Sequence, residues 1–116
     1  AVDLAGQATA ESVDGRTVSA AGGLLDFHRV ARASGDGRAI LALPATAKGR
    51  SRIVAAFEAG TRVSVPAPEA GFVVTQHGVA DLRDLDARAR AEALIAIASP
   101  EHRDPLCAAA RATVRA

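Results

Sequence analysis

The chain has 116 residues, with 14 Lys and Arg against 13 Asp and Glu and a formal net charge of +1. This length suffices for one domain with a modest core, and the near-neutral charge argues against general attraction to nucleic acid or to an anionic membrane. One cysteine and three scattered histidines exclude an internal disulfide and give no metal-ligand spacing. The sequence contains neither a membrane-length apolar run nor a signal-peptide pattern, so we expect a cytoplasmic protein without a metal site.

The N-terminal segment predicts a β-hairpin. Residues 2–13 and 16–20 flank Asp14-Gly15, a dipeptide that favours a two-residue turn because both of its residues tolerate positive φ. The chain starts at AVDL without an initiating Met, which leads us to expect a piece of a longer protein.

The stretch VSAAGGLLDFHRVARAS at 18–34 predicts a strand, a Gly-Gly turn and then a helix over 24–33. The helical face is expected to contain Leu24, Phe27 and Ala31. Gly22 and Gly23 would allow a ligand close to the backbone, at a helix N-terminus whose dipole favours negative charge. That position suits a phosphate, a carboxylate or a developing oxyanion, and a plain tight turn is the alternative interpretation.

The middle of the chain predicts a buried strand followed by a basic loop. Residues 39–43 (AILAL) are expected to form a strand buried on both faces, which Pro44 ends. The polar loop at 45–52 would lie at the carboxyl edge of the sheet, where open α/β sheets place their ligands. Lys48 lies in this loop and could pair with phosphates of a nucleotide-like ligand, or simply be solvated. Residues 53–57 and 62–65 predict a second hairpin.

The C-terminal third predicts one strand and two helices. A strand at 72–75 leads into Gln76-His77-Gly78, and a helix capped by Asp86 is expected to run to about residue 98. After one further turn, a last helix would start with Asp104 as cap and Pro105 in its first position. The order of elements predicts an α/β fold, an open mixed sheet flanked by helices.

Five sequence blocks, taken in order, resemble the C-terminal domain of the acetyl-CoA hydrolase/transferase family, of the 4-hydroxybutyrate and succinyl-CoA:acetate CoA-transferase type. The blocks are VDLAGQATAES at 2–12, GGLLDF at 22–27, ALPATAKGRSRIV at 42–54, FVVTQHGVADLR at 72–83 and RAEALIAIA at 90–98. The resemblance covers residues 1–116 as one CoA-transferase-like C-terminal domain whose upstream half is absent from this chain.

The resemblance implies that the full-length protein is an enzyme that moves CoA between an acyl-CoA and a carboxylate such as acetate, or hydrolyses the acyl-CoA. The family's nucleophilic glutamate lies upstream, so the fragment alone is expected to be inactive. Gly22 and Gly23 match glycines whose backbone amides contact the thioester oxygen, and Lys48 matches a basic loop near the CoA phosphates. No permanently bound cofactor is implied, because coenzyme A is the substrate. The implied partners are the upstream half, acyl-CoA and a small carboxylate, and a homo-oligomer is expected.

Four positions depart from the family pattern. Two are Ala21 and Val30, where family sequences often have a glycine. Gln76 and His77 stand where the family usually has Glu-Tyr, which puts in doubt any role that needs a carboxylate there. Two other interpretations therefore stay open. One is a non-catalytic module that binds CoA or another nucleotide, and the other is a structural α/β domain whose glycines are only turns.

Overall fold

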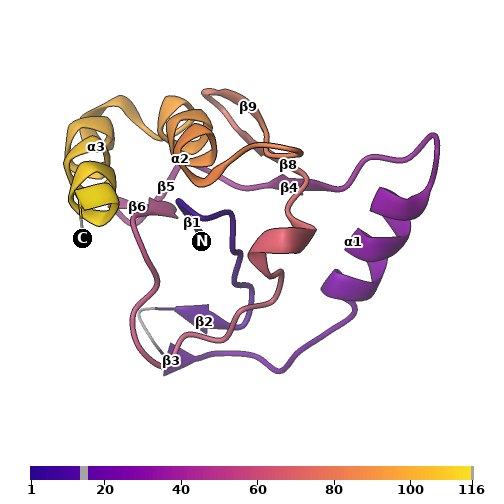
Figure 1. Ribbon diagram of the computed structural model, residues 1–116. Coiled ribbons are helices and arrows are strands. Elements are labelled where there is room, and N and C mark those ends of the chain that lie inside the picture. Colours follow the sequence, from indigo (N-terminus) through magenta and orange to yellow (C-terminus); the bar gives the residue numbers. More distant parts are fainter. Residues whose placement is uncertain (14–15, 116) are drawn as a thin grey trace.

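The computed structural model describes residues 1–13 and 16–115, except the side chains of residues 114 and 115 (Figure 1). The predicted turn at Asp14-Gly15 lies outside the described residues, although the strands on either side of it pair as a hairpin would. The elements are, in order, β1 (Val2–Asp3), β2 (Ser12–Val13), β3 (Arg16–Thr17), α1 (Leu24–Ala33), β4 (Ile40–Ala42), β5 (Thr46–Ala47), β6 (Arg50–Ser51), β7 (Ile53–Val54), the 3₁₀ helix η1 (Ala67–Glu69), β8 (Phe72–Thr75), β9 (Gly78–Asp81), α2 (Ala87–Ala96) and α3 (Pro100–Arg115).

The largest sheet is mixed, in the order β4-β8-β9. β4 runs parallel to β8 with Ile40 opposite Phe72, and β8 turns back into antiparallel β9 through Gln76-His77. The carboxyl ends of β4 and β8 therefore share one edge of the sheet. The segments that enter β4 and β8, together with the one that leaves β9, lie at the opposite, amino edge. The mixed α/β class predicted from the sequence is confirmed.

Only one face of this sheet is buried. Val73 and Ala80 are 1% and 2% exposed, whereas Ile40 and Val79 on the other face are 55% and 63% exposed. The prediction that the 39–43 strand is buried on both faces is thus wrong for this chain. The run AILAL is continuous in apolar character, but alternate residues of a strand point to opposite faces and this chain covers only one.

Two further predictions about the strands are wrong. β7 does not form a hairpin with residues 62–65 but pairs in parallel with β1, where Ile53 lies opposite Val2. The segment 45–52 is not an open loop, because β5 and β6 form a small antiparallel hairpin within it. Its turn consists of Lys48 and Gly49, with φ of 52° and 77°, the two positive values that a tight two-residue hairpin turn requires.

The helices begin where their sequence signals indicate, with one exception. α2 is capped as predicted, because the Asp86 side chain accepts a hydrogen bond from the Ala89 amide at 2.8 Å. The exception is α3, which is one continuous helix with Pro105 inside it rather than a helix that starts at Pro105. Pro105 removes only the bond to the Glu101 carbonyl near the helix start, and the helix continues past it.

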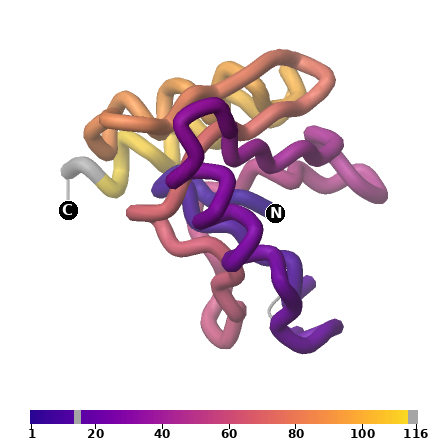
Figure 2. The backbone as a smooth tube through the Cα atoms, turned by 90° about the vertical axis from the view of Figure 1, so that its right-hand side faces the viewer, coloured from indigo at the N-terminus to yellow at the C-terminus, as the bar shows by residue number. Residues whose placement is uncertain are grey.

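The hydrophobic core joins the β1–β7 pair, the buried face of the sheet and the two C-terminal helices. Its most deeply buried large side chains are Val2, Ile53, Val65, Val73, Leu82 and Leu94. α1 stands on the opposite side of the molecule from α3 in Figure 1, and nearest the viewer in Figure 2. Among the described residues, no helix is long and apolar enough to cross a membrane.

Candidate functional site

Gly22 and Gly23 lie in the exposed segment that leads into α1. Gly23 is the N-cap residue, with φ −84° and ψ 5°, and its carbonyl accepts the first helical hydrogen bond from the Phe27 amide at 3.0 Å. Among the described residues, no side chain caps this end of the helix. Of the predicted strand, turn and helix, only the helix is confirmed, over Leu24–Ala33. The strand ends at Thr17, and residues 18–22 are irregular.

Backbone N–H groups at this helix start are free to meet a ligand. Within the part of the chain that the structure describes, no hydrogen bond uses the amides of Gly22, Gly23 or Leu24. Unpaired amides at a helix N-terminus form a partial positive charge that favours an anion. The geometry therefore allows the electrostatic role that the sequence suggested for this segment.

The backbone itself does not require glycine at these two positions. Neither residue has a φ in the left-handed region. A Cβ built on Gly22 would meet nothing within 4 Å, and one built on Gly23 would meet only the Phe27 ring, at 3.2 Å. A tight turn that demands positive φ is thus not the reason for the pair.

Lys48 occupies the tip of the β5–β6 hairpin, beyond the carboxyl end of β4. Its side chain is exposed, and its φ of 52° belongs to the turn. Gln76, at the end of neighbouring β8, fixes the base of the same connection because its Oε1 accepts a hydrogen bond from the Ala45 amide at 2.9 Å. Both residues therefore lie at the carboxyl edge of the sheet, as predicted for the basic loop.

The structure does not join these predicted site residues through its own contacts. Among the described residues, no hydrogen bond or ion pair connects Gly22 or Gly23 with Lys48. Two hollows in the described part of the surface contain none of Gly22, Gly23 and Lys48 in their linings. A shared site would need a ligand that spans the two places.

One of these hollows, of about 430 Å³, lies beside the approach to Gly22. It is lined by residues 17–21 together with Glu11 and Arg62. Glu11 Oε2 accepts a hydrogen bond from the Ser64 hydroxyl at 2.8 Å, and Arg62 Nε donates to Thr17 Oγ1 at 3.1 Å. No local sequence pattern predicts these two contacts, because the partners lie 53 and 45 positions apart.

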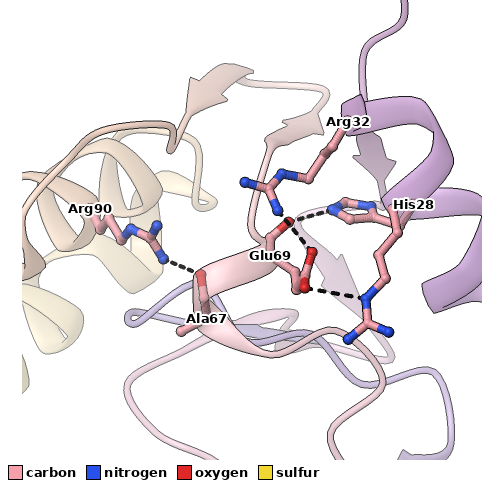
Figure 3. Close-up of polar contacts among 6 residues, drawn as sticks. His28, Arg32, Ala67, Glu69 and Arg90 are labelled. Atoms are coloured by element: carbon pink, nitrogen blue, oxygen red, sulfur yellow. Dashed lines mark hydrogen bonds and ion pairs between the residues drawn. The ribbon is translucent and has the colours of Figure 1, made fainter. Parts of the chain in front are cut away.

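α1 is fastened to the rest of the chain mainly by polar contacts (Figure 3). The buried His28 ring donates from Nε2 to the Glu69 carbonyl oxygen at 2.7 Å, and Arg29 and Arg32 bind the two Glu69 carboxylate oxygens at 3.2 and 2.8 Å. Burial raises the pKa of Glu69, but the hydrogen bonds and charges of the two arginines outweigh it and leave the pKa below its usual value. These contacts set the orientation of α1 and hence of its N-terminus.

The predicted apolar face of α1 is wrong in one residue. Leu24 and Ala31 are partly buried, but Phe27 is 78% exposed and His28 takes the buried position in its place. Phe27 and Val30, which is 70% exposed, form an outward apolar surface next to Gly23. The prediction placed Phe27 on the buried face because only apolar residues were expected to be buried, and His28 was not considered.

Other ligand chemistry has little support in the described residues. They contain no group of three or more His, Cys, Asp or Glu side chains arranged to hold a metal ion. Cys107 is partly buried and packs against the core as a small apolar residue would.

Comparison with known proteins identifies relatives along nearly the whole chain. The model of the acetyl-CoA hydrolase/transferase C-terminal domain matches residues 1–110. The chain is 45% identical over 107 residues to 4-hydroxybutyrate coenzyme A transferase of Clostridium kluyveri, and 40% identical over 110 residues to butyryl-CoA:acetate CoA-transferase of Anaerostipes caccae. Each alignment covers 90% of this chain but 25% of the relative, so the chain spans about a quarter of their length.

Solved structures give the same result. RipA from Yersinia pestis matches with a TM-score of 0.88 and 38% identity, over 97% of this chain and 26% of that one. A 4-hydroxybutyrate CoA-transferase from Porphyromonas gingivalis matches with a TM-score of 0.75 and 38% identity, over 97% of this chain and 24% of that one. The family resemblance carried by the five sequence blocks is confirmed, and this chain belongs to the acetyl-CoA hydrolase/transferase family, as part of its C-terminal domain.

Proposed function

We propose that this domain serves a longer enzyme that transfers coenzyme A from an acyl-CoA to a small carboxylate such as acetate, with water as the alternative acceptor. The named transferases among its relatives support this reaction class. The nucleophilic glutamate that the family resemblance implies would come from the upstream half. The enzyme would work in the cytoplasm and as a homo-oligomer.

The observation that carries the proposal is the open helix start at Gly22 and Gly23. When a nucleophile attacks the thioester carbonyl, negative charge develops on the carbonyl oxygen. Amide donors that are already oriented toward that oxygen stabilise the charge without reorganisation. The free N–H groups and the lack of any Cβ make this segment suited to that contact.

Lys48 would act separately, as a cation for the CoA phosphates. Its place at the tip of a hairpin leaves the ammonium group free to move with the ligand, and an ammonium attracts phosphate as a point charge. Gln76 is neutral where the family usually has a glutamate, so it would not act as a general base. Its side-chain amide would instead hold the start of the β5–β6 hairpin through the Ala45 amide.

The proposal is tested by comparing the 116-residue chain with the protein at its natural length. Each is incubated with acetyl-CoA or butyryl-CoA plus a carboxylate acceptor, and thiol release and new acyl-CoA are followed. We expect turnover only from the natural-length protein, because the fragment lacks the nucleophile. Turnover by the fragment at a comparable rate would contradict the proposal that the nucleophile lies in the upstream half. No turnover by the natural-length protein would favour a non-catalytic binding module.

A further inference from the structure

A second hollow, which we call the arginine cleft, is lined by four arginines. They are Arg32, Arg38, Arg83 and Arg90, and the only carboxylate among the described lining residues is Asp84. The cleft has a volume of about 470 Å³, within the usual range of roughly 300–1,000 Å³ for small-molecule sites. The thioester site proposed above uses none of these residues.

The arginine cleft lies away from that site. Its lining segments enter β4 and β8 and leave β9, which places it at the amino edge of the sheet, opposite Lys48 and Gln76. Arg32 lies in the last turn of α1, whereas Gly23 caps the first. A ten-residue helix is about 15 Å long, so the two ends of α1 face different sites.

Two of the four guanidinium groups are balanced by carboxylates. Arg32 pairs with Glu69 at 2.8 Å, and Arg83 pairs with Asp81 at 2.9 Å. The Arg83 guanidinium also lies over the Phe72 ring, 4.5 Å from its centroid, which holds it at the cleft wall. These two residues shape the cleft more than they add free charge.

Among the described residues, no ion pair neutralises the guanidinium groups of the other two arginines, Arg38 and Arg90. Arg90 Nη1 donates to the carbonyl oxygens of Ala67 at 2.6 Å and Ala5 at 3.0 Å, a contact that Figure 3 shows for Ala67. Arg38 Nη1 donates to the carbonyl of its neighbour Gly37 at 3.0 Å. Within the described part of the chain, neither residue forms a direct ion pair with a carboxylate, although, after the hydrogen bonds from Arg83, the charge of Arg38 contributes to the lowered pKa of nearby Asp81. Each can therefore offer further N–H donors to an anion.

We propose that the arginine cleft binds the diphosphate group of a small molecule, as a site separate from the thioester site. Guanidinium groups form paired hydrogen bonds with phosphate oxygens, and two uncommitted guanidinium groups suit two linked phosphates. A nucleoside diphosphate or free pyrophosphate could supply this group. The volume of the cleft accommodates either.

The test is titration calorimetry on the protein at its natural length, with pyrophosphate and ADP as probes. We expect both to bind, and binding to weaken as salt increases. Arg38→Gln should weaken binding about tenfold, the loss of one charge-assisted contact, and Arg38→Glu should weaken it further. Arg38 is exposed, and among the described residues its hydrogen bond is to Gly37 alone, so both variants should remain folded, which circular dichroism would check.

Two matched controls locate the site. Arg88→Gln removes an exposed α2 arginine that pairs with Glu92 outside the cleft, and Lys48→Gln removes the cation at the opposite edge of the sheet. Neither should change the affinity for pyrophosphate. Tighter binding of ADP would identify a nucleotide as the source of the group, and equal binding would identify free diphosphate. No binding, or a loss in Lys48→Gln as large as in Arg38→Gln, would overturn the proposal, whatever the transferase assay shows.

Discussion

The part of the molecule built from β8, β9, α2 and α3 packs on fully buried side chains, whereas α1 is held mainly by polar contacts with Glu69 of η1. Leu82 and Leu94 are 0% exposed and belong to the common core. In α1 the buried residue is His28, and it hydrogen-bonds to the Glu69 carbonyl. Burial of apolar side chains thus stabilises the first region, whereas hydrogen bonds and ion pairs are the main attachment of α1.

This difference bears on function because the proposed thioester contact is at the start of the weakly attached helix. Regions with few buried apolar contacts open most easily. The outward residues Phe27 and Val30 would be covered only by another part of the protein, and we propose that the upstream half covers them. The isolated chain should then self-associate, and a strictly monomeric species in sedimentation over a wide concentration range would count against this.

The largest stability effect should come from the packed region. Leu94→Ala deletes a fully buried side chain and should lower the free energy of unfolding by about 3 kcal/mol, through lost burial and a residual cavity. Phe27→Ala is the matched change in α1 and should cost less than about 0.5 kcal/mol, because the ring is already in water. Urea denaturation of both variants measures the contrast, and equal losses would show that the two regions are not held differently.

A middle-sized effect should come from the polar attachment of α1. His28→Ala removes the buried hydrogen bond and leaves the Glu69 carbonyl without that donor, which should cost about 1–2 kcal/mol. Hydrogen exchange should speed up in the α1 amides and stay unchanged in α2. Val30→Ala, on the exposed face of the same helix, is the control. Uniformly faster exchange throughout the chain would mean that α1 does not open separately.

The smallest effect is a pH dependence located at the amino group of Ala1. Burial, with added repulsion from Arg52, lowers the pKa of the Ala1 amino group of the 116-residue chain from 8.0 to about 6. The unfolded chain therefore binds the proton more strongly between pH 6 and 8, so stability should rise with pH across this window. Allowing for partial exposure, we expect about 1 kcal/mol.

Acetylation of the Ala1 amino group provides the control for this prediction. The acetylated chain has no titrating group at this position. The free energy of unfolding of the acetylated chain should therefore rise less between pH 6 and 8 than that of the free chain. If acetylated and free chains show the same slope in denaturation experiments, the amino group is not the cause.

The sequence predicted best those features that depend on neighbouring residues. The α1 bounds, the Asp86 cap and the 72–75 strand follow from local signals, and the structure confirms them. The five ordered blocks identified the family without any knowledge of contacts. The site residues Gly22, Gly23 and Lys48 stay predictions, since no contact in the structure tests their roles.

The sequence could not predict what depends on distant partners. Two-residue strands such as β1 and β7 carry no pattern of their own, and their pairing joins residues about fifty positions apart. The β5–β6 hairpin was missed because Lys48 takes a positive φ that lysine rarely adopts. His28 was not recognised as buried because its stabilising partner, the Glu69 carbonyl, lies 41 residues further along the chain.

The central claim is that Gly23 keeps the helix start open for a thioester oxygen. Gly23→Ala in the natural-length enzyme adds a Cβ 3.2 Å from the Phe27 ring with no backbone strain at φ −84°. Gly35→Ala, at the other end of α1 with nothing within 4 Å, is the matched control. Both variants should keep the melting temperature of the parent protein.

Thermal unfolding and steady-state kinetics on the same samples give the decisive measurement. We predict that Gly23→Ala lowers kcat far more than it raises KM, by up to the roughly 3 kcal/mol of barrier that a lost oxyanion donor costs, while Gly35→Ala changes neither. Full kcat per folded molecule in Gly23→Ala would contradict the account and would leave the glycine pair as a bend in the chain.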